Sequence, residues 1–182
     1  MKTRNTLSVV TRTLALSALL VAGSQPAGAS ESETLIQKVR GATQRYLNIN
    51  TAFAEGWVTA TPCVSGPDTG AMGVHLVLQS RIASGETKST EPQALIYEPK
   101  FDGSMRLVGV EFIVLASIWS ANNPAGSVPA VDGNLMNFVP APNRYGLPAF
   151  YELHVWAWER NPKGSFADWN TQVSCEQEQP AA

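Results

Sequence analysis

The stretch from Ala94 to Leu115, ALIYEPKFDGSMRLVGVEFIVL, contains two runs of β-branched and aromatic residues on either side of a turn. The runs ALIYE (94–98) and RLVGVEFIVL (106–115) are typical of strands. The Asp-Gly pair within PKFDGS (99–104) is a strong hairpin signal. We therefore predict that the two runs are antiparallel neighbours in one sheet.

Further segments complete the predicted fold. MGVHLVLQ (72–79) and YELHVWAWE (151–159) are two more candidate strands. Ahead of them, residues 32–55 carry apolar side chains at steps of three and four, which is typical of an amphipathic helix. These side chains are Leu35, Val39, Ala42, Tyr46, Ile49 and Phe53. The pattern predicts an α+β fold, with an N-terminal amphipathic helix packed on a curved antiparallel β-sheet.

The segment 120–148 is a long connection rich in proline, glycine and asparagine. Connections of this length inside a small domain are uncommon and serve either as functional lids or as ordered Ω-like excursions. The sequence leaves both interpretations open.

The N-terminus has the three parts of a secretory signal peptide. Lys2, Arg4 and Arg12 form a basic region, LALSALLVAG (14–23) is apolar, and AGA (27–29) offers small residues for cleavage. The apolar run is shorter than the roughly 20 residues that span a bilayer. We expect residues 1–29 to be a signal peptide, residues 30–182 to form a single domain without a membrane span, and the protein to be secreted or periplasmic.

The charge of the chain argues against some partners. The whole chain has a net charge of −2, and cleavage would remove three of 13 basic residues and none of 15 acidic ones, leaving −5. Nucleic acids and anionic membrane surfaces require clustered Lys and Arg, so neither is an expected partner. The sequence also lacks the GxSxG, Walker and dinucleotide-binding motifs of familiar hydrolases and nucleotide-binding proteins.

Cys63 and Cys175 are the only two cysteines. In an exported chain they are expected to form a disulfide. The alternative, two thiolate metal ligands, has no CxxC spacing to support it.

Three ionisable side chains lie in the middle of candidate strands among apolar neighbours: His75, Glu111 and His154. Burying such a group is costly unless it is paired, hydrogen-bonded or bound to a metal. If the three strand faces coincide, two imidazoles and one carboxylate converge on a site for a divalent transition metal, zinc, copper or iron. Glu152 lies on the His154 face and is a possible helper ligand. Such a site suits either catalysis or metal carriage.

Other interpretations stay open. Each histidine could be a core residue, with Glu111 paired to Arg106 or Arg144. Alternatively, the protein binds a small molecule without metal, or uses a His/Glu pair for acid–base catalysis, in a pocket with an aromatic wall. The wall residues would be Tyr151, Trp156 and Trp158. A purely structural or interaction role is the third possibility.

Two glycines and one acidic residue complete the candidate set. Gly73 and Gly109 are expected to leave room for a ligand beside the site. Asp168 in FADWN is interpreted as a turn or capping residue without a chemical role.

Several blocks of the sequence together resemble a group of exported bacterial proteins of unknown function. The blocks are TPCVSGPDTGAMGVH, EPQALIYEP, RLVGVEFIV and YGLPAFYELHVWAWERNPKGSFADWN, followed by VSC. They extend from about Cys63 to Cys175 and include His75, Glu111 and His154. The chain has DWNT at 168–171 where the group is expected to have DWNP. The resemblance implies one coherent domain and no particular reaction.

Overall fold

The computed structural model describes residues 34–178, which form one compact unit. Its helical elements are α1 (Leu35–Thr43), the 3-10 helix η1 (Gln44–Leu47), α2 (Ile49–Ala54), α3 (Gln79–Ser84) and α4 (Ala116–Asn122). Its strands are β1 (Val58–Thr59), β2 (Val64–Gly66), β3 (Gly70–Val77), β4 (Ala94–Pro99), β5 (Met105–Leu115), β6 (Ala130–Val131), β7 (Asn134–Leu135), β8 (Asn137–Val139) and β9 (Phe150–Val155). The expected signal peptide lies outside the described residues.

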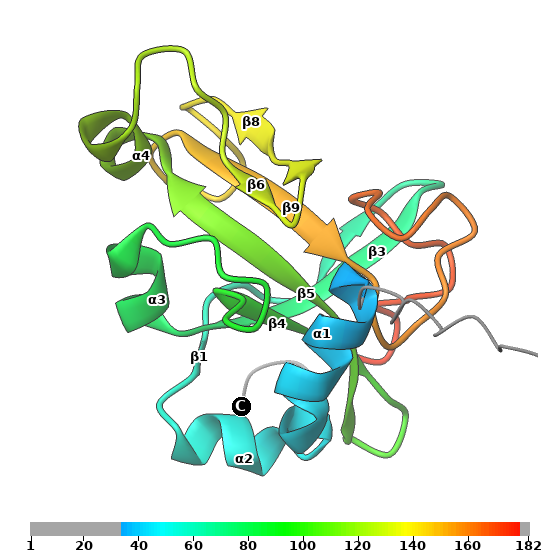
Figure 1. The fold of residues 1–182 in the computed structure, drawn as a ribbon. Coiled ribbons are helices and arrows are strands. Elements are labelled where there is room, and N and C mark those ends of the chain that lie inside the picture. The colour runs from blue at the N-terminus through cyan, green and yellow to red at the C-terminus, as the bar shows by residue number, and fades with distance from the viewer. Residues whose placement is uncertain (1–33, 179–182) are drawn as a thin grey trace, which may run out of the picture. The chain divides into compact units, whose positions relative to one another are not determined.

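One antiparallel sheet dominates the fold (Figure 1). Its strand order is β1-β3-β4-β5-β9-β8, and β2 pairs with the other half of β3. The predicted hairpin is confirmed, because β4 and β5 pair antiparallel from Pro99↔Met105 to Ala94↔Glu111. The predicted α+β class is confirmed as well.

The predicted continuous helix over 32–55 is wrong, because the segment is divided into α1, η1 and α2. Helix α1 begins with a capping box between Thr34 and Gln37. Helix α2 begins at Ile49, and the side chain of its N-cap, Asn48, accepts a hydrogen bond from the backbone N–H of Asn50. The change of axis leaves Phe53 47 % exposed, contrary to prediction.

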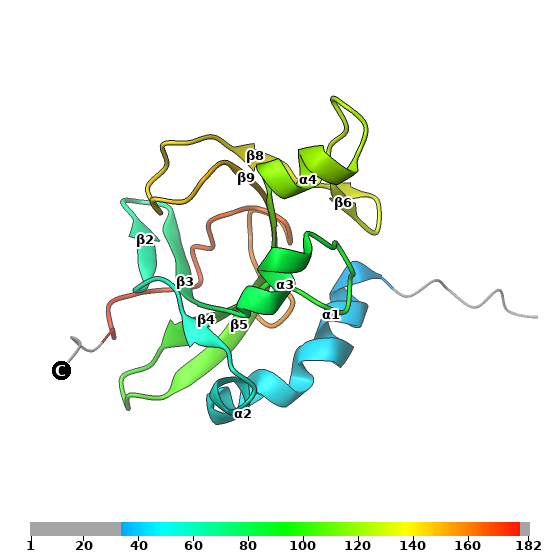
Figure 2. The same ribbon diagram turned by 90° about the vertical axis from the view of Figure 1, so that its left-hand side faces the viewer.

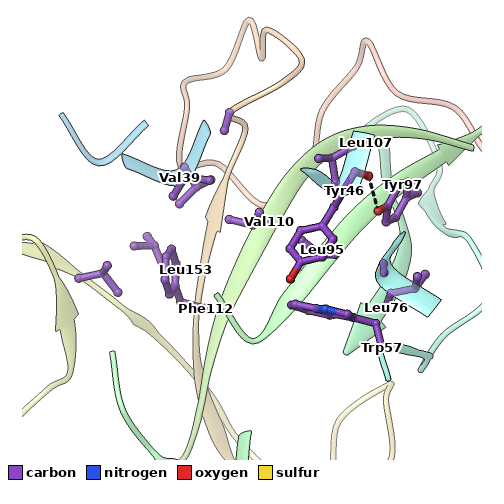
Figure 3. Close-up of a cluster of buried hydrophobic side chains, with 14 of the residues drawn as sticks. Val39, Tyr46, Trp57, Leu76, Leu95, Tyr97, Leu107, Val110, Phe112 and Leu153 are labelled. Atoms are coloured by element: carbon purple, nitrogen blue, oxygen red, sulfur yellow. Dashed lines mark hydrogen bonds between the residues drawn. The ribbon is translucent and has the colours of Figure 1, made fainter. Parts of the chain in front are cut away.

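One face of the sheet carries the largest buried cluster. Leu35 and Val39 of α1 belong to it together with Leu95 of β4 and Phe112 of β5. Figure 3 shows this cluster, including the hydrogen bond of 2.7 Å that the Tyr97 hydroxyl donates to the Tyr46 carbonyl. Burial of each large side chain contributes about 1.5–3 kcal/mol. The helical face is therefore the main core of the domain.

The other face of the sheet is covered by irregular chain. Ile96 of β4 packs there with Trp156 and Val173, which follow β9. Figure 2 shows helices α1 and α2 on one side of β4 and β5. Buried polar residues also lie on this second face.

The connection 120–148 contains short secondary structure. Helix α4 begins just before it, β6 and β7 form a two-stranded sheet, and β8 extends the main sheet beside β9. Near its end, Tyr145 packs against Phe150 with ring centroids 6.2 Å apart. The connection is thus an ordered excursion whose last part lies against the second face of the sheet.

A register shift between β4 and β5 changes the face on which the first residues of β5 lie. The shift lies at Ile96/Tyr97, where Ile96 pairs with Gly109 but Tyr97 pairs with Leu107. Leu107 therefore belongs to the helical-face cluster, whereas uninterrupted alternation along β5 would place it on the same face as Glu111.

The predicted disulfide Cys63–Cys175 is confirmed, with Cα atoms 5.6 Å apart. It joins the chain just before β2 to the segment after β9. Among residues 34–178, no helix is long and apolar enough to cross a membrane.

Glu98 at the end of β4 anchors the C-terminal segment. Its carboxylate is 2.7 Å from Arg106 Nη2 and 2.9 Å from Lys100 Nζ, and it accepts a hydrogen bond of 3.1 Å from the Ser174 amide. Burial alone would raise the pKa of Glu98, but these partners together hold it below its usual value. The ionised form is therefore the one that stabilises the fold.

Glu98→Gln is expected to destabilise the protein by about 1–3 kcal/mol at pH 7. A depressed pKa gives stability that is present above the unfolded-state pKa and is lost as the pH falls through the folded-state value. The difference between wild type and variant should therefore shrink below pH 4.5, the ordinary value for glutamate. Urea unfolding at pH 7 and pH 3 measures it. An equal difference at both pH values would contradict this role.

Candidate metal centre

Strand pairing brings the predicted ligands onto one face of the sheet. Glu111 lies directly opposite His154 of β9 and opposite Ala94 of β4. His75 of β3 is opposite Ile96, two positions along from the Val77↔Ala94 pair. Residues opposite one another in antiparallel strands point to the same side. The side chains of His75, Glu111 and His154 therefore share the face that irregular chain covers.

The small side chain of Ala94 allows contact across the intervening strand. Strand β4 separates His75 from Glu111, and Ala94 has only a methyl group there. His75 Nε2 is 3.3 Å from Glu111 Oε2, and both side chains are buried. The other ring nitrogen of His75 is 3.3 Å from the Thr61 hydroxyl. Both nitrogens of His75 thus have polar neighbours.

His154 lies in the centre of the group. It is 1 % exposed, and its ring centroid is 6.0 Å from that of His75. The indole of Trp156 lies nearly parallel to its ring, at 6.2 Å and 19°. Among residues 34–178, both ring nitrogens of His154 are buried atoms without a hydrogen-bond partner. Buried polar atoms usually have a hydrogen-bond partner, so both nitrogens are available to coordinate an ion.

Two further carboxylates flank His154. Glu152 precedes it by two residues on the same face and is 6 % exposed, and its Oε2 has no hydrogen-bond partner among the described residues. Asp168 comes from the segment after β9, and its Oδ1 is 3.6 Å from His154 Nδ1. That separation is too long for a hydrogen bond but short enough for a strong charge interaction.

Buried asparagines hold the segment that carries Asp168. Asn161 Nδ2 donates to the Trp169 carbonyl at 3.0 Å. The backbone N–H of Asn170 donates to the Ala71 carbonyl at 3.1 Å, which ties the segment to β3. These bonds place Asp168 over the sheet although no regular strand carries it.

The donor atoms lie close enough together to bind a metal ion. One ligand atom each of His75, Glu111 and His154 lies within 4.8 Å of the others, and the same holds for Glu152, His154 and Asp168. Ligand atoms of a tetrahedral ion with bonds of about 2.1 Å are about 3.4 Å apart. The His75–Glu111 distance of 3.3 Å already matches this spacing. Either group could hold an ion after small movements of its side chains.

Burial and the close approach of three carboxyl groups and two imidazoles shift the pKa values of the cluster. Burial and, to a smaller extent, the charge of His154 together lower the pKa of His75 to about 3. Burial raises the pKa of Glu111 to about 8, helped by the charge of Glu152. Burial alone would lower the pKa of His154, but Glu111, Asp168 and Glu152 raise it to about 9. The cluster therefore retains protons that a divalent cation could replace.

A small cavity of about 90 Å³ lies beside the cluster. His75 and Glu111 form its polar side, and most of the remaining wall is apolar. The cavity gives one side of the ligand group access to small molecules.

The structure overturns several expectations about the site's surroundings. The aromatic wall is wrong for Tyr151 and Trp158, which pack against the helical-face cluster. Trp158 Nε1 donates to the Thr43 hydroxyl at 3.0 Å. Trp156 does lie beside His154, but none of the three aromatic residues lines the cavity.

Gly73 and Gly109 allow neighbouring parts of the protein, rather than a ligand, to approach the backbone closely. A Cβ at Gly73, which has φ of +105°, would lie 2.6 Å from the Tyr97 carbonyl oxygen. A Cβ at Gly109 would lie 2.9 Å from the Val155 carbonyl oxygen and 3.3 Å from Trp156. The interpretation that they leave space for a ligand is therefore wrong.

The arginine partners suggested for Glu111 are also wrong. Arg106 pairs with Glu98 and Glu159, and the Arg144 guanidinium lies over the Trp169 ring. Asp168, which the sequence did not connect with the site, is in contact with His154. The FADWN turn gave no signal of this contact, because no strand periodicity links it to β9.

Comparisons with known proteins add no family to this geometry: no family model, no curated protein and no solved structure matches the chain. The resemblance to exported bacterial proteins therefore stays a prediction.

Proposed function

We propose that the protein binds one divalent transition-metal ion, zinc, copper or iron, through His75, Glu111 and His154. The observation that carries this proposal is the approach of their donor atoms to within 4.8 Å in a buried site. Imidazole and carboxylate donors together suit these three metals. The unpartnered nitrogens of His154 support the proposal, because a metal would satisfy at least one of them.

Asp168 and Glu152 have supporting roles in this proposal. Metal-binding histidines usually donate their other ring N–H to a carboxylate or carbonyl. Asp168 lies on the Nδ1 side of His154, so it would orient that ring and leave Nε2 for the ion. Glu152 would serve as a fourth ligand or accept a hydrogen bond from bound water.

The proposed place of action is outside the cytoplasm. The Cys63–Cys175 disulfide is compatible with an oxidising extracellular or periplasmic compartment. The predicted signal peptide and the resemblance to exported bacterial proteins support the same location.

Equilibrium dialysis with elemental analysis tests the metal proposal. After removal of bound metal with EDTA, wild type should take up one zinc ion per chain. The double variant His75→Ala/His154→Ala should lose at least about 100-fold in affinity, since loss of outer partners alone costs about 10–100-fold. Near-ultraviolet circular dichroism would show that the variant remains folded.

The exposed acidic pair Glu86 and Glu91, which contacts Lys88, provides a matched control. Glu86→Ala/Glu91→Ala should bind zinc like wild type. The proposal is wrong if wild type binds no metal, or if the histidine variant binds as much as wild type.

A further inference from the structure

The cavity beside His75 and Glu111 has the size and lining of a binding site for a small second ligand. Its volume is about 90 Å³. An apolar cavity of about 150 Å³ holds benzene, so this one has room for about three or four non-hydrogen atoms. A ligand that fits wholly inside the cavity is therefore smaller than an aromatic ring.

The cavity has a polar end and is otherwise lined mainly by apolar side chains. His75 and Glu111 lie together on one side, while Val77, Ile113 and Phe150 supply apolar surface. Cavities of this kind bind ligands mainly through apolar contact and use a few polar groups for orientation. The occupant that fits has one donor atom turned to the His75–Glu111 side and hydrocarbon elsewhere.

Charge favours a neutral occupant. The residues that line the cavity include no lysine or arginine. Glu111 is one of them, and Glu152 interacts electrostatically with it. An anionic ligand would therefore depend on the metal ion for compensation of its charge, whereas a neutral ligand loses little on desolvation.

Two hydroxyl groups in the lining differ in availability. The Thr61 hydroxyl is engaged with His75 Nδ1 at 3.3 Å. Among the described residues, the Tyr145 hydroxyl donates only to the Met72 sulfur, at 3.3 Å, and a thioether is a weak acceptor. Tyr145 can therefore turn its proton to a ligand at little cost.

We propose that this cavity binds a neutral molecule of up to about four non-hydrogen atoms, whose single donor atom occupies an open coordination position of the metal. The proposal rests on the proposed function, because the metal supplies the attraction for the donor atom. Beyond metal binding, this proposal states that the cavity selects the second ligand by its size.

Cobalt(II) in place of zinc provides the test, because its visible absorption changes when a ligand is added. Methyl isocyanide has three non-hydrogen atoms, and tert-butyl isocyanide has the same donor carbon on a larger body of six. In cobalt-loaded wild type, methyl isocyanide should shift the spectrum saturably, and tert-butyl isocyanide should bind at least about tenfold more weakly.

Variants that reduce the cavity sharpen the test. Ile113→Phe fills the interior, and Ala60→Leu narrows the lining at an exposed position. Each should retain one cobalt per chain and lose at least about tenfold in affinity for methyl isocyanide. If Ile113→Phe does not fold, the effect of Ala60→Leu on methyl isocyanide binding tests the cavity proposal. Ala125→Leu, an exposed change outside the cavity, should behave like wild type.

The outcomes separate the two proposals. Cobalt binding without any response to methyl isocyanide overturns the cavity proposal and leaves the metal proposal standing. Equal binding of both isocyanides, or binding unaffected by Ile113→Phe and Ala60→Leu, also overturns it. Failure of wild type to bind cobalt overturns both.

Discussion

Glu111→Gln is expected to weaken zinc binding at least about 100-fold and to make the metal-free protein more stable at pH 7. The first effect follows because the variant has lost an anionic ligand. The second follows because burial raises the pKa of Glu111 to about 8 from its ordinary 4.5, so folding at pH 7 requires the uptake of a proton. This requirement costs up to about 3 kcal/mol, which glutamine avoids.

The sign of the pH dependence provides a further check. A carboxyl group with a raised pKa in the folded state makes the fold less stable as the pH rises from 4.5 towards about 8. The advantage of the variant should therefore be largest above neutrality and disappear near pH 4. Urea unfolding in EDTA at pH 4 and pH 7 measures it. Glu91→Gln, at an exposed carboxylate, should change stability by less than about 0.5 kcal/mol.

Opposite effects on binding and stability would distinguish a metal site from a structural cluster. If His75, Glu111 and His154 served only to hold the strands together, Glu111→Gln would be less stable than wild type in EDTA at pH 7. That result would contradict a metal-binding role for the three residues.

Replacing both cysteines, as in Cys63→Ala/Cys175→Ala, is expected to destabilise the protein by roughly 4–5 kcal/mol. The bridge joins residues 112 positions apart, and the chain-entropy model predicts a large effect for so long a loop. The loss is a substantial part of the roughly 5–15 kcal/mol that stabilises a typical domain. Urea unfolding of the variant beside wild type, both in EDTA, measures it.

The disulfide also bears on the metal site. Cys175 follows the segment that carries Asp168, and Val173 of that segment packs on the second face of the sheet beside Ile96. Without the bridge, this segment is held by the Glu98–Ser174 and Asn170–Ala71 hydrogen bonds. Zinc affinity should fall by less than about tenfold, because His75, Glu111 and His154 lie on strands. A stability change below about 1 kcal/mol would contradict the predicted role of the bridge.

The strands and their facing could be predicted because they depend on local periodicity. Alternation within 106–115 and 151–159 placed Glu111 and His154 on faces that the sheet then brought directly opposite one another. The hairpin at Asp102-Gly103 fixed the pairing of β4 with β5. Both features are determined by residues that are close together in the sequence.

The remaining features depend on tertiary structure. The sequence did not show that β4 lies between His75 and Glu111, nor that Ala94 leaves the space in which they meet. Asp168 reaches His154 through a segment positioned by buried asparagine hydrogen bonds, which have no periodic pattern. The break at Asn48 did have a local signal, since asparagine is a preferred N-cap, but the regular apolar spacing across it outweighed that signal.

A crystal structure of the zinc-soaked protein, with anomalous diffraction measured on both sides of the zinc absorption edge, tests the proposed metal site most directly. We expect one anomalous peak within about 2.0–2.2 Å of His75 Nε2, a Glu111 oxygen and a His154 nitrogen. A peak only at surface carboxylates, or no peak in crystals soaked in excess zinc, would contradict metal binding by these three residues.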